Sequence, residues 1–481
     1  MYLGIDLGTS GVKALLIDGA GKVVGAATPP LTLSRPHPGW SEQDPADWVV
    51  AAYAALDALK HDHARDLAAV KGIGLSGQMH GATLIDEADE PLRPAILWND
   101  TRAHAEAARL DADPRFREIS GNIVFPGFTA PKLLWVRASE REIFDHTVKV
   151  LLPKDYLRLW LTGEHVSDMS DASGTSWFDV GARGWSPDLL DACHMRLDQM
   201  PALVEGNAVS GELRAELAAR WGMTGPVVVA GGGGDNAASA IGTGTISAGA
   251  AFVSLGTSGV LFAANESYLP NPESAVHAFC HALPDRWHQM GVILSAASAL
   301  TWYATIAETA PAALMEELGD SLEPPGPVTF LPYLSGERTP HNDADIRAAF
   351  IGLSHETDRA SLTRAVIDGV AFALRDCQEA LGAAGTGLSS VMAVGGGSRA
   401  HLWLEAIATA LGLPVEVPGQ GETGAALGAA RLGLLAATGA DPVEICRPPK
   451  VERVVEPVSD LRAAYEDAYG RYGALYRALK G

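Results

Sequence analysis

One five-letter segment, LGTSG, occurs twice in the chain and constrains its fold more than any other feature. The copies occupy residues 7–11 and 255–259. Each copy follows one apolar run and precedes another, which is the pattern of two strands joined by a short glycine loop. A repeat with the same context on both sides indicates two structurally related halves. We therefore expect two domains, residues 1–245 and 246–481, with a hinge near 240–250.

The segments around the repeat predict an α/β fold, because strand-like and helix-like patterns alternate along the chain. Short apolar runs next to glycine predict strands at 2–7, 12–18, 23–28, 69–77, 82–86, 227–230 and 391–394. Apolar residues at helical spacing predict helices at 44–60, 361–381, 423–438 and 460–480. The polar, turn-rich segment 331–354 predicts a loop or an insertion.

Charge and cysteine usage exclude several classes of protein. With 36 basic and 58 acidic residues the net charge is −22, so the surface repels phosphate backbones and we expect no nucleic-acid partner. The four cysteines are far apart and form no CxxC motif, which predicts reduced thiols in a cytoplasmic protein. The first residues lack a basic segment, and no run of 18 apolar residues occurs, so we expect neither a signal peptide nor a membrane span.

The two LGTSG loops are candidate phosphate sites. Glycine lets the backbone approach a ligand closely, and successive N–H groups in such a turn form a concavity for anions. Two loops facing one cleft could hold adjacent phosphates of a nucleotide, although a plain glycine-rich hairpin is the alternative. The candidate nucleotide-binding residues here are Gly8, Thr9, Ser10, Lys13, Gly256, Thr257 and Ser258.

Two aspartates carry the predicted chemistry. Asp6 ends the first strand beside a proposed phosphate site, where a carboxylate is repulsive unless it orients Mg²⁺, which we expect to occur through water. The alternative is that Asp6 caps the hairpin turn. Asp235 follows four glycines and is the candidate acceptor for a hydroxyl proton during phosphoryl transfer to a sugar. The alternative for Asp235 is the N-cap of a helix that starts there.

Polar and aromatic residues after two predicted strands form a candidate sugar site. Sugars need an apolar surface for stacking together with amides and carboxylates for their hydroxyl groups. GQMHG (77–81) and LWNDTR (97–102) supply this mixture, and a purely structural histidine at position 80 is the alternative. The candidate substrate-binding residues are Met79, His80, Trp98, Asn99, Asp100, Asp235 and Asn236.

Competing motifs are weaker. Residues 72–77 spell GxGxxG, but a dinucleotide site requires a helix at the last glycine, and a loop and a strand follow here. His277, Cys280 and His281 have metal-compatible spacing without a fourth ligand nearby, which favours structural roles. No GxxxxGK[ST] motif occurs, so any use of ATP proceeds without a P-loop.

The ordered motifs resemble those of the FGGY carbohydrate kinases, a family of the actin/hexokinase/Hsp70-type ATPase superfamily. Residues 4–10 and 254–259 resemble its two phosphate motifs, 395–398 its adenosine motif, and 131–136 and 352–369 its signatures. The resemblance implies two RNase H-like domains around a central cleft that binds ATP, Mg²⁺ and a sugar. It also implies a homodimer.

The resemblance assigns roles residue by residue. It makes Asp235 the general base, Asn236 a sugar contact, Thr9 and Thr257 phosphate contacts, and Lys13 the basic residue after the first loop. It adds Gly395, Gly396 and Gly397 as nucleotide-binding residues. Glycerol kinases have a base-contacting asparagine near the position of Ala400, so how this chain holds adenine stays open.

The substrate expected from the resemblance is D-xylulose, phosphorylated at C5. The stretches 34–45, 77–84, 93–100, 151–159 and 331–341 are similar to those of family members that act on this sugar. Glycerol kinases have an Arg-Glu pair where this chain has Met79 and His80. The open alternatives are another sugar or polyol, such as ribulose, and a non-kinase ATPase of the same fold. An oxidoreductase that binds NAD is a more distant third.

Overall fold

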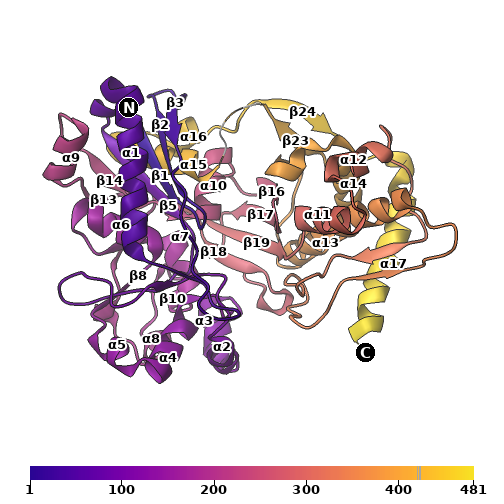
Figure 1. Cartoon of the computed structure of the whole chain (residues 1–481), viewed down its shortest axis with the longest axis horizontal. Coiled ribbons are helices and arrows are strands. Elements are labelled where there is room, and N and C mark those ends of the chain that lie inside the picture. The colour runs from indigo at the N-terminus through magenta and orange to yellow at the C-terminus, as the bar shows by residue number, and fades with distance from the viewer. Residues whose placement is uncertain (420, 422–423, 481) are drawn as a thin grey trace.

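The computed structural model describes residues 1–419, 421 and 424–480 and contains two mixed β-sheets (Figure 1). The N-terminal sheet has the order β13 (Val209–Glu212), β14 (Val228–Ala230), β5 (Gly72–Gly77), β1 (Tyr2–Leu7), β2 (Val12–Ile17) and β3 (Val23–Ala27), and β15 (Gly233–Gly234) pairs with β5. The C-terminal sheet has the order β18 (His277–Cys280), β19 (Trp287–Ile293), β17 (Gly259–Asn265), β16 (Ala251–Leu255), β22 (Val391–Val394), β23 (Val415–Pro418) and β24 (Val451–Val455).

The two sheets share one connectivity, which confirms the α/β class and the internal repeat. In each sheet a hairpin, β1–β2 or β16–β17, is antiparallel, and its first strand pairs in parallel with a later strand. The two identical loops close at different register positions. Leu7 pairs with Val12, leaving four loop residues, whereas Leu255 pairs with Gly259, leaving three. Identical sequence therefore gives a similar turn that is tighter in the second half.

Helices cover the faces of both sheets. The N-terminal half carries α1 (Pro45–Ala68), α6 (Pro153–Thr162), α9 (Ala215–Trp221) and α10 (Asp235–Thr243). The C-terminal half carries α11 (Ala297–Ile306), α12 (Pro311–Glu317), α13 (Arg359–Ala383), α14 (His401–Leu411) and α17 (Arg462–Lys480). The first helix begins where the sequence predicts, but it extends beyond residue 60 because Leu67 returns to the core after a kink at His63.

A smaller lobe is inserted into the N-terminal half. Its helices are α2 (His104–Asp111), α3 (Pro114–Ser120), α4 (Thr129–Ser139), α5 (Arg141–His146), α7 (Met169–Ala172) and α8 (Pro187–Ala192). Short two-stranded sheets join the lobe and other loops, formed by β4 (Glu42–Gln43) with β7 (Ala95–Ile96), β6 (Thr83–Ile85) with β8 (Lys149–Leu151), β9 (Val166–Asp168) with β12 (Ala202–Val204), β10 (Phe178–Asp179) with β11 (Gly184–Trp185), and β20 (Thr329–Leu331) with β21 (Ala349–Ile351).

One helix from late in the sequence packs on the N-terminal sheet. α15 (Ala425–Thr438), followed by α16 (Pro442–Ile445), lies beside β1 and α10 in Figure 1. The predicted start of this helix, Thr423, lies outside the described residues. A Cβ on Gly74 would approach the Ala429 oxygen to 1.8 Å, and one on Gly428 would approach the Ala238 oxygen to 1.7 Å. Glycine therefore permits the backbone contact that ties α15 to the N-terminal half.

The structure also describes the most apolar helices and the state of the four cysteines. Within the described part of the chain, no helix combines the length and apolar character that a membrane crossing requires. The cysteines at 193, 280, 377 and 446 are all free and buried, and burial raises the pKa of each thiol. Such thiols behave as small apolar groups and are poor nucleophiles at neutral pH.

Candidate active site

A pocket of about 310 Å³ lies where the two halves meet. The N-terminal half lines it with Met79, His80, Trp98, Asp235 and Asn236. The C-terminal half lines it with Ser254, Gly256, Thr257, Ser258, Val260, His277, Phe279, Met290, Val292 and Arg338. The pocket thus joins the second phosphate loop, the predicted base and most of the predicted sugar contacts.

Asp235 opens α10 at the end of the glycine run. Gly232 has a φ of 81°, and a Cβ there would lie 2.3 Å from the Leu75 oxygen, so only glycine lets this backbone pass. The Asp235 Oδ1 accepts hydrogen bonds from the Asn236 backbone N at 2.7 Å and from Asn236 Nδ2 at 3.0 Å. Oδ2 has no such partner among the described residues and is left for a ligand.

The environment of Asp235 suits a proton acceptor near neutral pH. Burial, followed by the charge of Asp6, raises the pKa of the Asp235 carboxyl to about 6, while the hydrogen bonds from Asn236 oppose this shift. A general base works best when its pKa lies near the working pH. The N-cap of α10 is Gly234 and Asp235 is the first residue of the helix, without a side-chain capping hydrogen bond, so the N-cap alternative for Asp235 is wrong. Its role as a general base stays a prediction.

Asp6 lies at the end of β1, next to the first loop. Its carboxylate accepts a hydrogen bond from the Ser76 hydroxyl at 2.6 Å, and its Cα pairs across the hairpin with Lys13. Among the described residues, no three His, Cys, Asp or Glu side chains converge as a metal cage. This donor set fits Mg²⁺, which needs one or two carboxylates and takes its other ligands from water and substrate phosphates.

His80 is held in one orientation and one charge state. Its φ is 68°, its Nδ1 lies 2.7 Å from the Gly174 oxygen, and its ring stacks on Phe128 at 4.4 Å. The buried Lys132 and Thr129 both donate to its backbone oxygen. Burial lowers the pKa of the His80 imidazole to about 3, so the ring is neutral at physiological pH.

The first LGTSG loop, a predicted phosphate site, contacts the pocket through Trp98. The Trp98 Nε1 donates to Thr9 Oγ1 at 3.0 Å, and that hydroxyl donates to Gln78 Oε1 at 2.9 Å. Trp98 remains 46% exposed, which leaves an aromatic surface for a ligand. Gly8, Thr9, Ser10 and Lys13 do not line the pocket themselves.

Two predicted sugar contacts, Asn99 and Asp100, also lie outside the pocket lining. The buried Asp100 carboxylate accepts hydrogen bonds from the Ser41 backbone N at 2.6 Å and from Arg102 Nη2 at 2.7 Å. Arg102 in turn contacts Glu42 at 2.8 Å. Asp100 therefore braces the loop that carries Trp98, and the pocket geometry gives no support to a direct sugar contact by Asp100.

The predicted adenosine motif lines a second pocket of about 380 Å³ that is mostly apolar. Its lining includes Gly396, Gly397, Ala400, Leu300, Pro311, Met315 and Trp403. Gly395 has a φ of 89°, and a Cβ there would lie 3.0 Å from the Leu255 oxygen, so this turn packs directly against the end of β16. The second pocket therefore adjoins the loop 256–258.

The pocket lining also contains residues that were not among the predicted site residues: Ser254, Val260, His277, Phe279, Met290, Val292 and Arg338. The structural role favoured for His281 agrees with its Nε2 lying 3.1 Å from the Thr245 oxygen, whereas His277 lines the pocket. The missed signal was alternation in β18, which places His277 and Phe279 on the same face of the strand. Arg338 comes from a long loop, and no local pattern predicted that it reaches this pocket.

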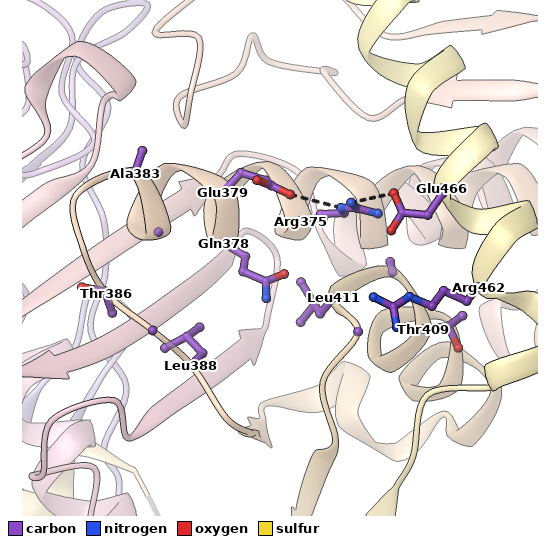
Figure 2. A pocket seen from close by; sticks show the side chains of 14 residues that line it. Arg375, Gln378, Glu379, Ala383, Thr386, Leu388, Thr409, Leu411, Arg462 and Glu466 are labelled. Carbon is purple, nitrogen blue, oxygen red and sulfur yellow. Dashed lines mark hydrogen bonds and ion pairs between the residues drawn. The ribbon is translucent and has the colours of Figure 1, made fainter.

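A separate cavity of about 490 Å³ lies in the C-terminal half, between α13, α14 and α17 (Figure 2). Its charged groups largely pair with one another. Arg375 contacts Glu466 at 2.9 Å and Glu379 at 3.5 Å. None of the predicted functional residues lines this cavity, so its size alone does not make it the reactive site.

Comparison with known proteins agrees with this geometry. Residues 1–242 match the N-terminal domain of the FGGY family of carbohydrate kinases, and residues 251–437 match its C-terminal domain. The xylulose kinase of Escherichia coli K12 is 50% identical over 485 residues, covering 100% of this chain and 99% of the relative. That of Bacillus subtilis 168 is 36% identical over 99% of this chain and 98% of the relative.

Solved structures extend the comparison. A protein described as a "xyloylose kinase" from Brucella ovis has a TM-score of 0.99 at 65% identity, covering 100% of this chain and 99% of that chain. Plasmodium falciparum glycerol kinase has a TM-score of 0.89 at 21% identity, covering 99% of this chain and 97% of that chain, which shows the shared fold. The fold is thus the two-domain, actin/hexokinase-type fold of sugar kinases. Family models match both halves of the chain, and relatives match it over its whole length. The chain therefore belongs to the FGGY family of carbohydrate kinases.

Proposed function

We propose that this protein transfers the γ-phosphoryl group of ATP to the C5 hydroxyl of D-xylulose, giving D-xylulose 5-phosphate and ADP. The observation that carries the proposal is the placement of Asp235 in one pocket with Met79, His80 and the second phosphate loop. The names of the full-length relatives support D-xylulose as the substrate.

Asp235 is the proposed general base. The C5 oxygen attacks the γ-phosphorus in line, its bond to phosphorus forms, and the bond to the β–γ bridging oxygen breaks. The hydroxyl proton passes to Oδ2 of Asp235, because Oδ1 is already engaged by Asn236. Asn236 thereby orients the carboxylate and adjoins the sugar.

The two pockets divide ATP between them in this proposal. The apolar pocket beside Gly396, Gly397 and Ala400 holds the adenine through shape and apolar contact, since alanine offers no side-chain amide there. The loop 256–258 lies between the pockets and holds phosphates through backbone N–H groups and the hydroxyls of Thr257 and Ser258. Lys13 and the loop residues Gly8, Thr9 and Ser10 approach the phosphates from the other half.

Magnesium belongs to the proposal as well. Asp6 is the residue that would hold Mg²⁺, through water, with Asp235 nearby. The ion, when bound, neutralises charge on the phosphates. Burial is the main cause of the raised pKa of Asp235, and the charge of Asp6 adds to it, which supports a cation near both carboxylates.

Three further properties are proposed. The close contacts of α15 and α16 with the N-terminal half support a first domain of residues 1–245 together with these two helices. The remainder of 246–481 is the second domain. The buried free cysteines support a cytoplasmic location. Family membership supports a homodimer, which light scattering of the purified protein tests.

A sugar panel tests the function. The purified protein is mixed with ATP and Mg²⁺, and ADP release is followed with D-xylulose, D-ribulose, glycerol or no sugar. We expect the highest kcat/KM with D-xylulose. Equal ADP release with and without sugar would indicate a non-kinase ATPase, and a preference for ribulose or glycerol would replace the substrate.

A further inference from the structure

Arg338 occupies a fixed position in the first pocket. The residues on both sides of it are tied to the end of β19, because Leu294 N donates to the side-chain Oε1 of Glu337 at 2.9 Å and the backbone N of Thr339 donates to the Val292 oxygen at 3.1 Å. Its guanidinium lies 4.6 Å from the ring of Phe125, which belongs to the N-terminal half. The side chain therefore spans the boundary between the halves.

The guanidinium has uncommitted hydrogen-bond donors. It carries five N–H groups. Among the described residues its only hydrogen-bond acceptor is His277 Nε2, 3.3 Å from Arg338 Nη1. The adjacent Glu337 carboxyl does not neutralise it fully, because burial raises the pKa of Glu337 to about 8. Arg338 thus presents a cation with free donors to the pocket.

Arg338 lies at the end of the pocket away from the base. Arg338 contacts His277, whose ring lies 5.7 Å from that of Phe128, and Phe128 stacks on His80 at 4.4 Å, whereas the hydrogen bonds of the Asp235 carboxylate come from Asn236. A pentose whose C5 hydroxyl meets Asp235 therefore extends its C1–C2 end toward His80 and Arg338.

The chemistry of a ketopentose requires a donor at that end. Ring closure of this sugar joins C2 to the C5 oxygen, so a molecule with a free C5 hydroxyl is open-chain and carries a ketone at C2. A ketone oxygen only accepts hydrogen bonds. His80 cannot supply a donor there, because its Nδ1 hydrogen goes to Gly174 and its Nε2 accepts, and the Trp98 Nε1 hydrogen goes to Thr9.

We propose that Arg338 determines specificity for the ketone form of the sugar, by donating a hydrogen bond from its guanidinium to the C2 carbonyl oxygen of the open-chain substrate. This inference rests on the proposed function. It adds a residue from the C-terminal half to the sugar site, so that the sugar itself bridges the two halves. A sugar alcohol with a hydroxyl at C2 gains less from this cation than the ketone does.

The test compares Arg338→Met with Arg141→Met. Arg141 is an exposed arginine on α5 whose ion pair is with Asp145. Each protein is assayed with D-xylulose, and with xylitol and D-arabinitol, the two pentitols formed by reducing its ketone. Pentitols are measured as competitive inhibitors, so they need not be phosphorylated. We expect Arg338→Met to raise KM for D-xylulose about 10- to 100-fold, the range for a lost hydrogen bond to a charged group, and to change pentitol Ki values less than about threefold. Arg141→Met should match the wild type.

The outcomes separate the two proposals. If wild type shows no sugar-dependent ADP release with D-xylulose, the proposed function fails and this inference falls with it. If wild type is active but Arg338→Met is unchanged, or weakens ketone and pentitols equally, only the role of Arg338 is overturned. ATP affinity and thermal unfolding check that the variant is folded. If Arg338→Met does not fold, Arg338→Lys, which keeps the positive charge, is assayed in its place. The ratio of its affinity for the ketone to its affinity for the pentitols is then compared with that of the wild type.

Discussion

The imidazole Nδ1 of His80 lies 2.7 Å from the backbone oxygen of Gly174. A carbonyl oxygen can only accept, so Nδ1 carries the hydrogen and Nε2 keeps its lone pair. Because burial lowers the pKa of this ring to about 3, it does not gain a second proton at neutral pH. The ring nitrogen of His80 opposite Gly174 is therefore an acceptor, and we predict that a sugar hydroxyl donates to it.

Replacing His80 by phenylalanine tests this acceptor. His80→Phe keeps a ring that can stack on Phe128 but removes both nitrogens. We expect KM for D-xylulose to rise about tenfold, the cost of one neutral hydrogen bond, with little change in KM for ATP. The exposed His61 provides the control, because His61→Phe should leave both constants unchanged. A KM that titrates near pH 6.5 in wild type would contradict the neutral ring.

The role of Asp235 predicts a selective loss of turnover. Asp235→Asn keeps the shape of the side chain but cannot take the hydroxyl proton, so we expect kcat to fall roughly 10²–10⁴-fold while ATP still binds. Asp188, in the first turn of α8, occupies a similar helix position away from the pocket, and Asp188→Asn should keep full activity. If Asp235→Asn retains more than a few per cent of the rate, Asp235 serves only as a helix-start residue.

The same carboxylate predicts the pH dependence. Its pKa is raised to about 6, so kcat/KM should fall as pH drops through 6 and Asp235 gains a proton. The charge of Asp6 contributes to this elevation, so Asp6→Asn should move the acid limb of its residual activity to lower pH. Profiles of kcat/KM between pH 4.5 and 8 measure both effects. An acid limb at the same pH in both proteins would show that Asp6 does not act on Asp235.

Local signals predicted the hairpins and drew attention to Asp235, which lines the pocket. Residues 2–17 alternate apolar runs with a glycine loop, and Asp235 ends a glycine run, so neither required knowledge of distant residues. The pairing of Asp100 with Arg102 was equally local, but the pattern LWNDTR was interpreted as sugar chemistry because burial is not visible in sequence.

Contacts between segments that lie far apart in the sequence were not predicted. Arg338 reaches the pocket from a loop between β20 and β21, and α15 crosses to the opposite half. A signal existed for α15, since glycines on β1 and β5 match small residues on the helix, a combination typical of close backbone contact. The stretch 331–341, which contains Arg338, was noted only for its resemblance to family members that act on D-xylulose, and Arg338 itself was not singled out because an arginine in a polar loop is ordinarily exposed.

The close contact between α15 and α10 predicts that one methyl group added at this contact lowers the stability of the protein. A Cβ on Gly428 would lie 1.7 Å from the Ala238 oxygen, three residues after Asp235. We expect Gly428→Ala to cost about 1–3 kcal/mol of stability through overpacking, and to lower activity by displacing α10. Gly470 on α17 is the control. A Cβ there meets nothing within 4 Å, so Gly470→Ala should be neutral or slightly stabilising in thermal unfolding. Equal melting temperatures for the two variants would contradict the close packing.

A buried carboxyl under the C-terminal helix predicts a pH-dependent stability. Asp368 of α13 accepts a hydrogen bond from the Tyr465 hydroxyl of α17 at 2.7 Å, and burial raises the pKa of Asp368 to about 7. Between pH 4 and 7 the unfolded chain holds fewer protons at this site than the folded one, so unfolding releases a proton and stability falls as pH rises. Asp368→Asn carries no such charge and removes this slope.

The stability of Asp368→Asn relative to wild type should therefore increase by about 1.4 kcal/mol per pH unit between pH 5 and 7, measured by denaturant unfolding. Asp358, the N-cap of the same helix, contributes to stability with the opposite pH dependence. Its pKa is lowered by hydrogen bonds from Ser361, so its contribution is present at neutral pH and is lost on acidification. Asp358→Asn should thus be weakest relative to wild type at neutral pH and recover only as pH falls below about 4. Parallel stability curves for Asp368→Asn and wild type would mean that Asp368 is ionised at pH 5 in the folded protein, and that the α13–α17 contact tolerates its charge.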